Sequence, residues 1–498
     1  MTASSTGNRI LDRIERIGNA LPHPVTLFAL ALVLVMIGSQ IAAWADWSVR
    51  HPARDELIVA RGLLSSDGLW WLFDNLVTNF TGFPPLGVVV VAMLGIGIAE
   101  RSGLLPDVLT RLLRITPAAL LPPAVVFVGI LSSLTLDAGY VVLPPLAAAL
   151  FHAAGRSPLA GLAASFAGVS AGFSANLTVT AVDSMLARFS ERAAQLVEPS
   201  YQVPDTANLW FMMVSSVILT LAGWWITARV IEPRQAPGAT ATDANTTTTD
   251  SGAAQAPRAL RAAGVAFAVT ATLLLAGVLI PGGPLHGAAE HSARWIAAIV
   301  PMLFIGFLIP GIAYGIKAGT FRSDHDIATS LAAIIADLAP YIVLAFVAAQ
   351  FTAAFSYSHL GELIGITGGR ALAVLDLPAV ILALGFLVMA MAANLFIGSA
   401  SAKYAFMAPV FVPMLMQANL SPEATQAAYR VGDSITNIIT PLNPYWVIVV
   451  GFMQRWRPEA GIGTLMALML PYALGFAVVW PALLAIWLAL GIPLGPGV

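Results

Sequence analysis

The stretch NLFIGSASAKYAFMAPVFVPMLMQANLSPEATQAAYRVGDSITNIITPLNPYW, residues 394–446, decides the fold. It carries Lys403, Arg430 and Asp433 in a chain that is 58% hydrophobic and only 10% charged. Residues 138–170 align with part of it without a gap, at a constant offset of 264. Ten of the 33 aligned positions are identical, and the Tyr, Pro and Ser-Pro matches are the most informative. Two copies of an interrupted, polar-lined element in an apolar chain are typical of transporters.

Composition places the chain in the membrane. Soluble domains carry about 25% charged residues, against 10% of the 498 residues here. The fold class expected is therefore an all-α polytopic membrane protein, with the lipid bilayer as its surroundings. A net charge of −2 gives no reason to expect nucleic acid as a partner. The absence of cysteine excludes disulfides, thiol catalysis and Cys-ligated metals.

Apolar runs of about 20 residues predict about nine transmembrane helices. They lie near 24–46, 84–100, 117–136, 205–231, 259–281, 294–316, 336–356, 377–396 and 463–491. The interrupted regions between them predict two re-entrant hairpins. The expected organisation is a cytoplasmic amphipathic helix over 1–23, a first half over 24–231 with a hairpin at 138–173, a flexible cytoplasmic linker over 232–258, and a second half over 259–498 with a hairpin at 400–435.

The placement of arginine and lysine predicts the orientation. Basic residues before the first span put the N-terminus in the cytoplasm, and basic loops near 101–116, 320 and 456 belong on the same side. The segment 47–83 is then an outer loop, and the C-terminus is periplasmic. With this parity the first hairpin enters from outside and the second from inside. Sequence identity and charge thus indicate an inverted repeat by separate routes.

Each hairpin turns at a Ser-Pro pair, at 157–158 and 421–422. Proline suits the first turn of a helix and does not continue the helix before it. A polar run follows each hairpin, SANLTVTAVD at 174–183 and DSITNIITPLNP at 433–444. Unwound backbone there offers oxygens to a hard cation. The candidate cation ligands in these runs are Asn176, Thr178, Asn437 and Asn443.

Two carboxylates in these runs, Asp183 and Asp433, are candidate functional groups, because charge inside a membrane is costly. One alternative is that Asp433 only neutralises Arg430, three residues earlier on the same helical face. For Asp183 the alternative is that its helix has already reached the interface, since Arg188 follows closely.

Asn394, Lys403 and Tyr404 are further candidates, and two of them have two readings. Asn394 belongs either to the site or to a helix-to-helix hydrogen bond. Lys403 is expected to be an interfacial lysine whose ammonium reaches water at the hairpin mouth. Tyr404 either stacks on an aromatic ligand or packs against its neighbours.

No enzyme motif is present: there is no P-loop, no GxSxG and no HExxH. Transport would therefore use an ion gradient, with H+ or Na+ as the coupling ion and no cofactor. An intramembrane enzyme such as an acyltransferase is the alternative from another class. It would need a histidine beside a carboxylate in a wet pocket.

Several segments resemble the AbgT family over nearly the whole chain. They are ERIGNALPHPVTLF, NFTGFPPLGVVVVAMLGIGIAERSGLLP, DAGYVVLPPLAAALFHAAGRSPLAGLAASFAGVSAGFSANL, VIEPR, APVFVPM, R-x-x-D-S, GFMQR and LPY. The resemblance implies a homodimer whose subunits each have nine transmembrane helices and two hairpins. It also implies transport of p-aminobenzoyl-glutamate, or export of p-aminobenzoate and sulfonamides, driven by proton or sodium gradients.

The resemblance implies a set of substrate or coupling-ion residues. These are Asp183, Asn394, Tyr404, Pro422, Arg430, Asp433 and Pro441. Where the family often has tryptophan, this chain has Tyr404, which keeps an aromatic face and adds a hydroxyl. The expectation is an exporter of aminobenzoate-type or sulfonamide antimetabolites in the bacterial inner membrane. The alternative is an importer of p-aminobenzoyl-glutamate or dicarboxylates coupled to sodium or protons.

Overall fold

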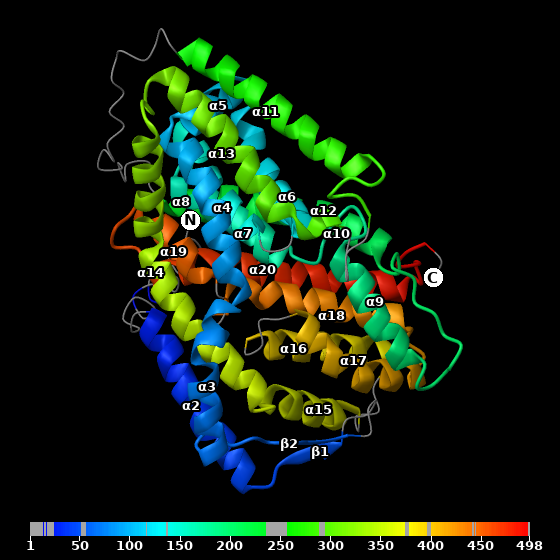
Figure 1. The fold of residues 1–498 in the computed structure, drawn as a ribbon. Helices are drawn as coiled ribbons and strands as arrows, with labels where there is room; N and C mark the ends of the chain where they lie inside the picture. Colours follow the sequence, from blue (N-terminus) through cyan, green and yellow to red (C-terminus); the bar gives the residue numbers. More distant parts are fainter. Residues whose placement is uncertain are drawn as a thin grey trace.

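The computed structural model describes Arg13, Arg16 and residues 24–50, 56–115, 117–135, 138–235, 256–287, 294–373, 378–395, 400–440, 443 and 445–496. Helices dominate these residues (Figure 1). Those of the first half are α2 (Pro24–Trp44), α3 (Ser66–Thr81), α4 (Pro84–Arg101), α5 (Leu104–Ile115), η1 (Ala118–Leu120), α6 (Leu121–Leu131), η2 (Ser132–Thr135), α7 (Ala138–Ala153), α8 (Pro158–Phe166), η3 (Ala167–Ala171), α9 (Ala181–Ala194), α10 (Leu209–Ile226), η4 (Thr227–Ile231) and η5 (Glu232–Arg234).

The second half is built in the same way. Its helices are α11 (Ala256–Leu279), α12 (Arg294–Ala297), α13 (Ile299–Ala318), α14 (Asp324–Tyr357), α15 (Leu360–Ala373), α16 (Ala379–Asn394), α17 (Ala400–Gln417), α18 (Pro422–Ile435), η7 (Thr436–Ile438), α19 (Trp446–Gln454) and α20 (Ile462–Ala489). A short antiparallel pair of β1 (Ser48–Arg50) and β2 (Leu57–Val59) is the sheet found in the described part of the chain.

The all-α membrane architecture is confirmed. Within the described ranges, seven helical stretches are long and apolar enough to cross a membrane. The expected spans 117–136 and 377–396 hold the shorter apolar helices α6 and α16, so the count of nine stays a prediction. Of the amphipathic segment 1–23 only Arg13 and Arg16 are described, both helical and exposed. Residues 236–255 of the expected linker lie outside the described residues.

The expectation that 47–83 is a loop is wrong. It contains the β1–β2 pair and then α3, whose start is capped by Ser65: its Oγ accepts a hydrogen bond from the amide of Gly68 at 3.1 Å. Pro84 begins α4 soon after α3 ends at Thr81, so Ser66–Arg101 makes one apolar stretch of 36 residues. Phe83 between them is extended, and proline suits a helix start, which explains why a second helix begins there.

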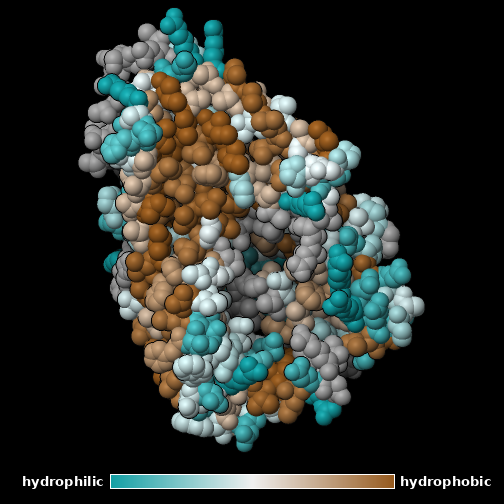
Figure 2. Space-filling view, viewed as in Figure 1, coloured by the Kyte–Doolittle hydropathy of each residue, from teal (hydrophilic) through white to brown (hydrophobic). Residues whose placement is uncertain are grey.

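Apolar side chains face outward over much of the molecule. Figure 2 shows a broad hydrophobic face where Figure 1 places α4, α13 and α14. On α11, Val265, Phe267 and Leu273 are all more than half exposed. Such a surface suits lipid, because hydrocarbon imposes no cost on exposed apolar side chains.

The two hairpins have equivalent turns. Gly155 and Asn419, 264 positions apart, both adopt the left-handed conformation, with φ of 69° and 61°. In each turn the next amide donates to the carbonyl five residues earlier, at 2.8 Å. This pattern ends a helix by satisfying its last carbonyls. Pro158 and Pro422 then begin the returning helices α8 and α18.

The returning helices also pack alike on the helix that precedes each hairpin. A β-carbon on Gly168 would lie 2.5 Å from the carbonyl oxygen of Val126 on α6. A β-carbon on Gly432 would lie 2.4 Å from the carbonyl oxygen of Leu387 on α16. No side chain fits at such a distance, so both positions require glycine. The repeat therefore extends from sequence to backbone packing.

The hairpin tips lie at opposite ends of the helical stretch that begins with α10. Arg156 at the first tip forms an ion pair of 2.7 Å with Glu232, beyond the C-terminal end of α10. At the second tip, Asn208, the residue that precedes α10, donates to the backbone carbonyl of Glu423 at 2.9 Å. Tyr201 donates to the Glu423 carboxylate at 3.1 Å. Burial, and then this carboxylate, raises the pKa of Tyr201.

Candidate functional site

Helix α18 carries the charged residues of the second hairpin, and all fourteen of its residues are buried. It packs against α9, α16, α17 and α20. Six buried polar residues lie on it: Glu423, Thr425, Gln426, Arg430, Asp433 and Ser434. Buried polar groups are costly unless they are paired, so the partners of these side chains define the site.

Arg430 joins the two halves of the chain. Its Nη1 pairs with Oδ1 of Asp183, and its Nη2 donates to the carbonyl of Ser174 at 2.9 Å. The other oxygen of Asp183 accepts from the amide and hydroxyl of Thr180, at 2.7 and 2.5 Å. Asp183 is 4% exposed, so its carboxylate lies inside the protein. The alternative that its helix has reached the membrane interface stays a prediction. The position of Asp183 at the start of α9 also suits a carboxylate, which the helix dipole stabilises.

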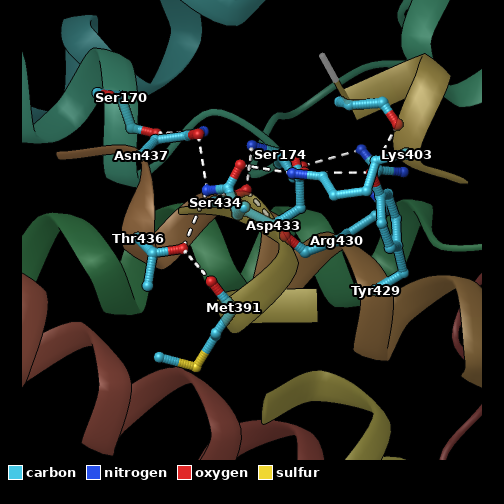
Figure 3. A network of polar contacts seen from close by, with 12 residues as sticks. Ser170, Ser174, Met391, Lys403, Tyr429, Arg430, Asp433, Ser434, Thr436 and Asn437 are labelled. Carbon is cyan, nitrogen blue, oxygen red and sulfur yellow. Dashed lines mark hydrogen bonds and ion pairs between the residues drawn. The ribbon is translucent and has the colours of Figure 1, made fainter. Parts of the chain in front are cut away.

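Asp433 has a different cation. Its Oδ1 lies 2.5 Å from Nζ of Lys403, and Tyr429 donates to the same oxygen at 3.1 Å (Figure 3). The reading in which Asp433 only neutralises Arg430 is therefore wrong: the carboxylate of the first half pairs with Arg430. The expectation of an interfacial Lys403 is also wrong, because the residue is 0% exposed. Its ammonium turns inward, where a carboxylate offsets the cost of burial.

Asn394, the last residue of α16, connects this ion pair to η7. Its Oδ1 accepts from Nζ of Lys403 at 2.5 Å. Its Nδ2 lies within 2.9 Å of Thr436 Oγ1, Asn437 Oδ1 and the carbonyl of Asp433. Asn394 therefore makes a helix-to-helix hydrogen bond, and its role in the site stays a prediction.

The candidate aromatic residue lies next to the same cluster. The ring of Tyr404 packs on that of Tyr429 with centroids 4.3 Å apart. Its hydroxyl is 2.7 Å from Oγ of Ser190 on α9, and it is 0% exposed. Pro422 is buried at the start of α18. Pro441 lies outside the described residues.

The candidate cation ligands are only partly brought together. Asn437 and Asn443 both donate to Ser170 in η3, to its carbonyl at 3.3 Å and its hydroxyl at 3.4 Å. Asn176 is buried, and its Oδ1 has no hydrogen-bond partner among the described residues. Thr178 is exposed and does not share this environment. The η3–η7 contact, visible between Ser170 and Asn437 in Figure 3, is a second place where the two halves meet.

Sequence reasoning missed the pairing partners. Lys403 and Tyr429 complete the Asp433 environment, and Ser174 holds Arg430. A signal for Lys403 existed, since it is one of only two lysines in the chain. The enzyme alternative gains little from the structure: His359 lies 3.4 Å from Glu362, but both side chains are about one-third exposed. No three metal-binding side chains cluster within the part of the chain that was searched.

Comparison with known proteins agrees with this architecture. The model of the AbgT putative transporter family matches residues 9–498. The p-aminobenzoyl-glutamate transport protein of Escherichia coli K12 is 34% identical over 500 residues, covering 100% of this chain and 98% of that protein.

Two solved structures are similar as well. The YdaH transporter of Alcanivorax borkumensis, described as having an unusual topology, is 45% identical with a TM-score of 0.54, covering 95% of this chain and 100% of that chain. MtrF of Neisseria gonorrhoeae, described as illuminating a class of antimetabolite efflux pumps, is 40% identical with a TM-score of 0.52, covering 98% and 99%. These are transporters and not enzymes. On this evidence the chain belongs to the AbgT family of membrane transporters.

Proposed function

We propose that the chain is an ion-gradient-driven secondary transporter that exports p-aminobenzoate-type or sulfonamide antimetabolites across the bacterial inner membrane. It acts as a homodimer, with the N-terminus in the cytoplasm and the C-terminus in the periplasm. The similarity to an antimetabolite efflux pump over almost the whole chain supports export.

The observation that carries the proposal is that the Arg430 guanidinium is buried with one N–H unsatisfied among the described residues. It is 1% exposed, it bridges the two halves, and its Nε is buried without a hydrogen-bond partner in the described structure. An unsatisfied buried N–H costs free energy. A substrate carboxylate would satisfy it, since guanidinium and carboxylate match in a two-point geometry. In this proposal the substrate anion competes with Asp183 for Arg430.

The aromatic part of the substrate has a place nearby. The rings of Tyr404 and Tyr429 pack in a tilted arrangement with centroids 4.3 Å apart, and Tyr429 also donates to Asp433. An aminobenzoate ring that entered beside Tyr404 would replace its contact with the Tyr429 ring by a contact with the substrate ring. Coupling by H+ would act at the cluster of Lys403, Asp433 and Asn394. Coupling by Na+ would use side-chain oxygens, which hard cations prefer, and Asn176, Asn437 and Asn443 are the candidates to supply them.

A second candidate is the import of p-aminobenzoyl-glutamate or another dicarboxylate. The relative from Escherichia coli favours it through its description as a p-aminobenzoyl-glutamate transport protein. The two buried cations, Arg430 and Lys403, would give a dicarboxylate two points of attachment.

The test is transport of labelled p-aminobenzoate and p-aminobenzoyl-glutamate in proteoliposomes, under imposed pH and sodium gradients of both directions. Export predicts that p-aminobenzoate moves in the direction opposite to the ion, which flows down its own gradient. Asp433→Ala should abolish this uphill transport, whereas Glu459→Ala, at an exposed pair with Arg457, should not. Wild-type transport by Asp433→Ala would refute the assignment, and movement of p-aminobenzoyl-glutamate with the ion would favour import.

A further inference from the structure

The two lysines of the chain differ in their surroundings. Of 24 basic residues only Lys317 and Lys403 are lysines, so the other 22 are arginines. Lys317 is exposed at the end of α13, where an ammonium meets water. Lys403 is 0% exposed in the first turn of α17. The chain therefore uses arginine almost everywhere and places a lysine at the centre of its site.

The surroundings of Lys403 hold an ammonium. Nζ is 2.5 Å from Oδ1 of Asp433 and 2.5 Å from Oδ1 of Asn394. From α18, Tyr429 shares the Asp433 oxygen.

Other charged side chains on the described helices around α17 have partners of their own: Arg430 of α18 pairs with Asp183 of α9, and Glu362 of α15 lies against His359. Glu423 of α18 accepts from Tyr201, and Glu191 of α9 accepts from the amide of Val203. Arg188 and Arg192 of α9 are exposed. The two buried pairs sum to zero charge while Lys403 is protonated.

The two buried pairs differ in one chemical property. Arginine keeps its proton in proteins, so Arg430 cannot release one. A buried lysine can lose its proton, because burial penalises the charged form and the amine is a stable alternative. Of the two buried cations, Lys403 is therefore the one that can carry a transferable proton.

We propose that Lys403 carries the coupling proton of the transport cycle, and that Asp433 and Asn394 hold its ammonium form. An N–H bond of the ammonium breaks, the electron pair stays on Nζ, and the proton passes to water on one side of the membrane. The amine then takes up one proton from the other side. Asp433 stays ionised throughout. The summed charge of the two buried pairs, Arg430–Asp183 and Lys403–Asp433, therefore alternates between zero and minus one. This inference rests on the proposed ion-driven transport.

The first test observes the proton directly. The variant K317R leaves Lys403 as the single lysine, so isotope-labelled lysine gives one side-chain NMR signal. We expect this signal to change from the ammonium to the amine form within the pH range over which transport changes rate. In K317R with D433N the change should occur at lower pH, because the counter-anion is lost. A lysine that stays an ammonium throughout that range would overturn the proposal.

The second test uses transport. K403R keeps the charge but cannot release the proton, so uphill p-aminobenzoate transport should fall roughly tenfold or more. The double variant K403Q with D433N buries no unpaired charge and should remain folded. It should carry p-aminobenzoate down its own gradient and fail to couple it to a pH gradient.

Uphill transport by K403R at the wild-type rate would also overturn the proposal. Absence of transport by the wild type in the same liposomes would refute the proposed function instead. The NMR titration would still decide the role of Lys403 in that case, because it needs no substrate.

Discussion

The first hairpin unit, residues 138–183, and the second, residues 400–445, share the conformation of their turn and a close glycine contact. They differ in the side chains that they bury. Both turn through a left-handed residue before a Ser-Pro pair, and both place a glycine against a carbonyl of the preceding helix. Where the second unit has Arg430 and Asp433, the first has Phe166 and Val169 at the same offset. Gly139 corresponds in the same way to Lys403.

The difference shows which residues hold a fold and which are free to acquire function. Gly168 and Gly432, Pro145 and Pro409, and Pro158 and Pro422 fix backbone geometry and are the same in both units, whereas many other positions differ. The buried side chains of the first unit provide packing, and those of the second provide charge. Asp183 is the exception, because it follows the first hairpin yet completes the ion pair of Arg430. The site therefore depends on contact between unlike units.

The largest expected difference in stability and transport is between substitutions of Arg430 and of its counterpart in the first unit, Phe166. Arg430→Met leaves Asp183 buried without its cation, which should cost about 3–5 kcal/mol and abolish transport. Phe166→Leu removes only packing and should cost ~1–2 kcal/mol with transport retained. Thermal unfolding in detergent and p-aminobenzoate transport measure the two effects. Equal loss of transport in both variants would mean that the units share the chemistry.

A smaller effect should be the same in both units. Gly168→Ala and Gly432→Ala each force a β-carbon against a backbone carbonyl, so each should lower stability by about 1–3 kcal/mol. Gly451→Ala on α19 is the matched control, because no atom lies within 4 Å of the added carbon. Unfolding temperatures compare the three variants. Tolerance at Gly168 alone would show that the backbone repeat is incomplete.

The smallest effects belong to the hairpin tips. Arg156→Gln breaks a partly exposed ion pair and should cost ~0.2–1 kcal/mol. Tyr201→Phe removes a hydrogen bond to buried Glu423 and should cost ~0.5–1.5 kcal/mol.

The Tyr201 contact should also depend on pH. Because the folded-state pKa of Tyr201 is raised, its contribution is complete below the ordinary tyrosine pKa of about 10 and declines as pH rises toward the raised value. Chemical denaturation at neutral and alkaline pH measures this. An alkaline loss that persists unchanged in Tyr201→Phe would contradict it.

Much of the framework could be predicted from local sequence. The Ser-Pro turns and the offset of 264 located the helices of both hairpins, because prolines and turn residues act through their own backbone. The helix α3 was missed, although Ser65 and the run SDGLWWLFDNLVTNFT indicate a capped helix. Counting only spans of about 20 apolar residues concealed it, because polar residues interrupt the run.

Several candidate residues lie together in the structure, but their pairing could not be predicted from the sequence. Arg430 and Asp433 are three residues apart, and that spacing alone predicts an ion pair. Tertiary contacts decided otherwise, because Asp183 approaches from the first half and Lys403 from the adjacent helix. No local pattern contains a contact across 247 positions. Lys403 was misplaced for a related reason: its burial depends on how α16, α17 and α18 pack together.

The two hairpin tips contact opposite ends of the helical stretch that begins with α10, and this has a practical consequence. Leu209–Arg234 has 26 residues, which corresponds to about 39 Å along a helix and exceeds the ~30 Å of the hydrocarbon core. We therefore expect the two turns to face different compartments. A cysteine at position 156 or at exposed position 417, in a chain with none of its own, should then label only from its own side. Sidedness of labelling with a membrane-impermeant thiol reagent would therefore read the topology of the repeat directly in intact cells.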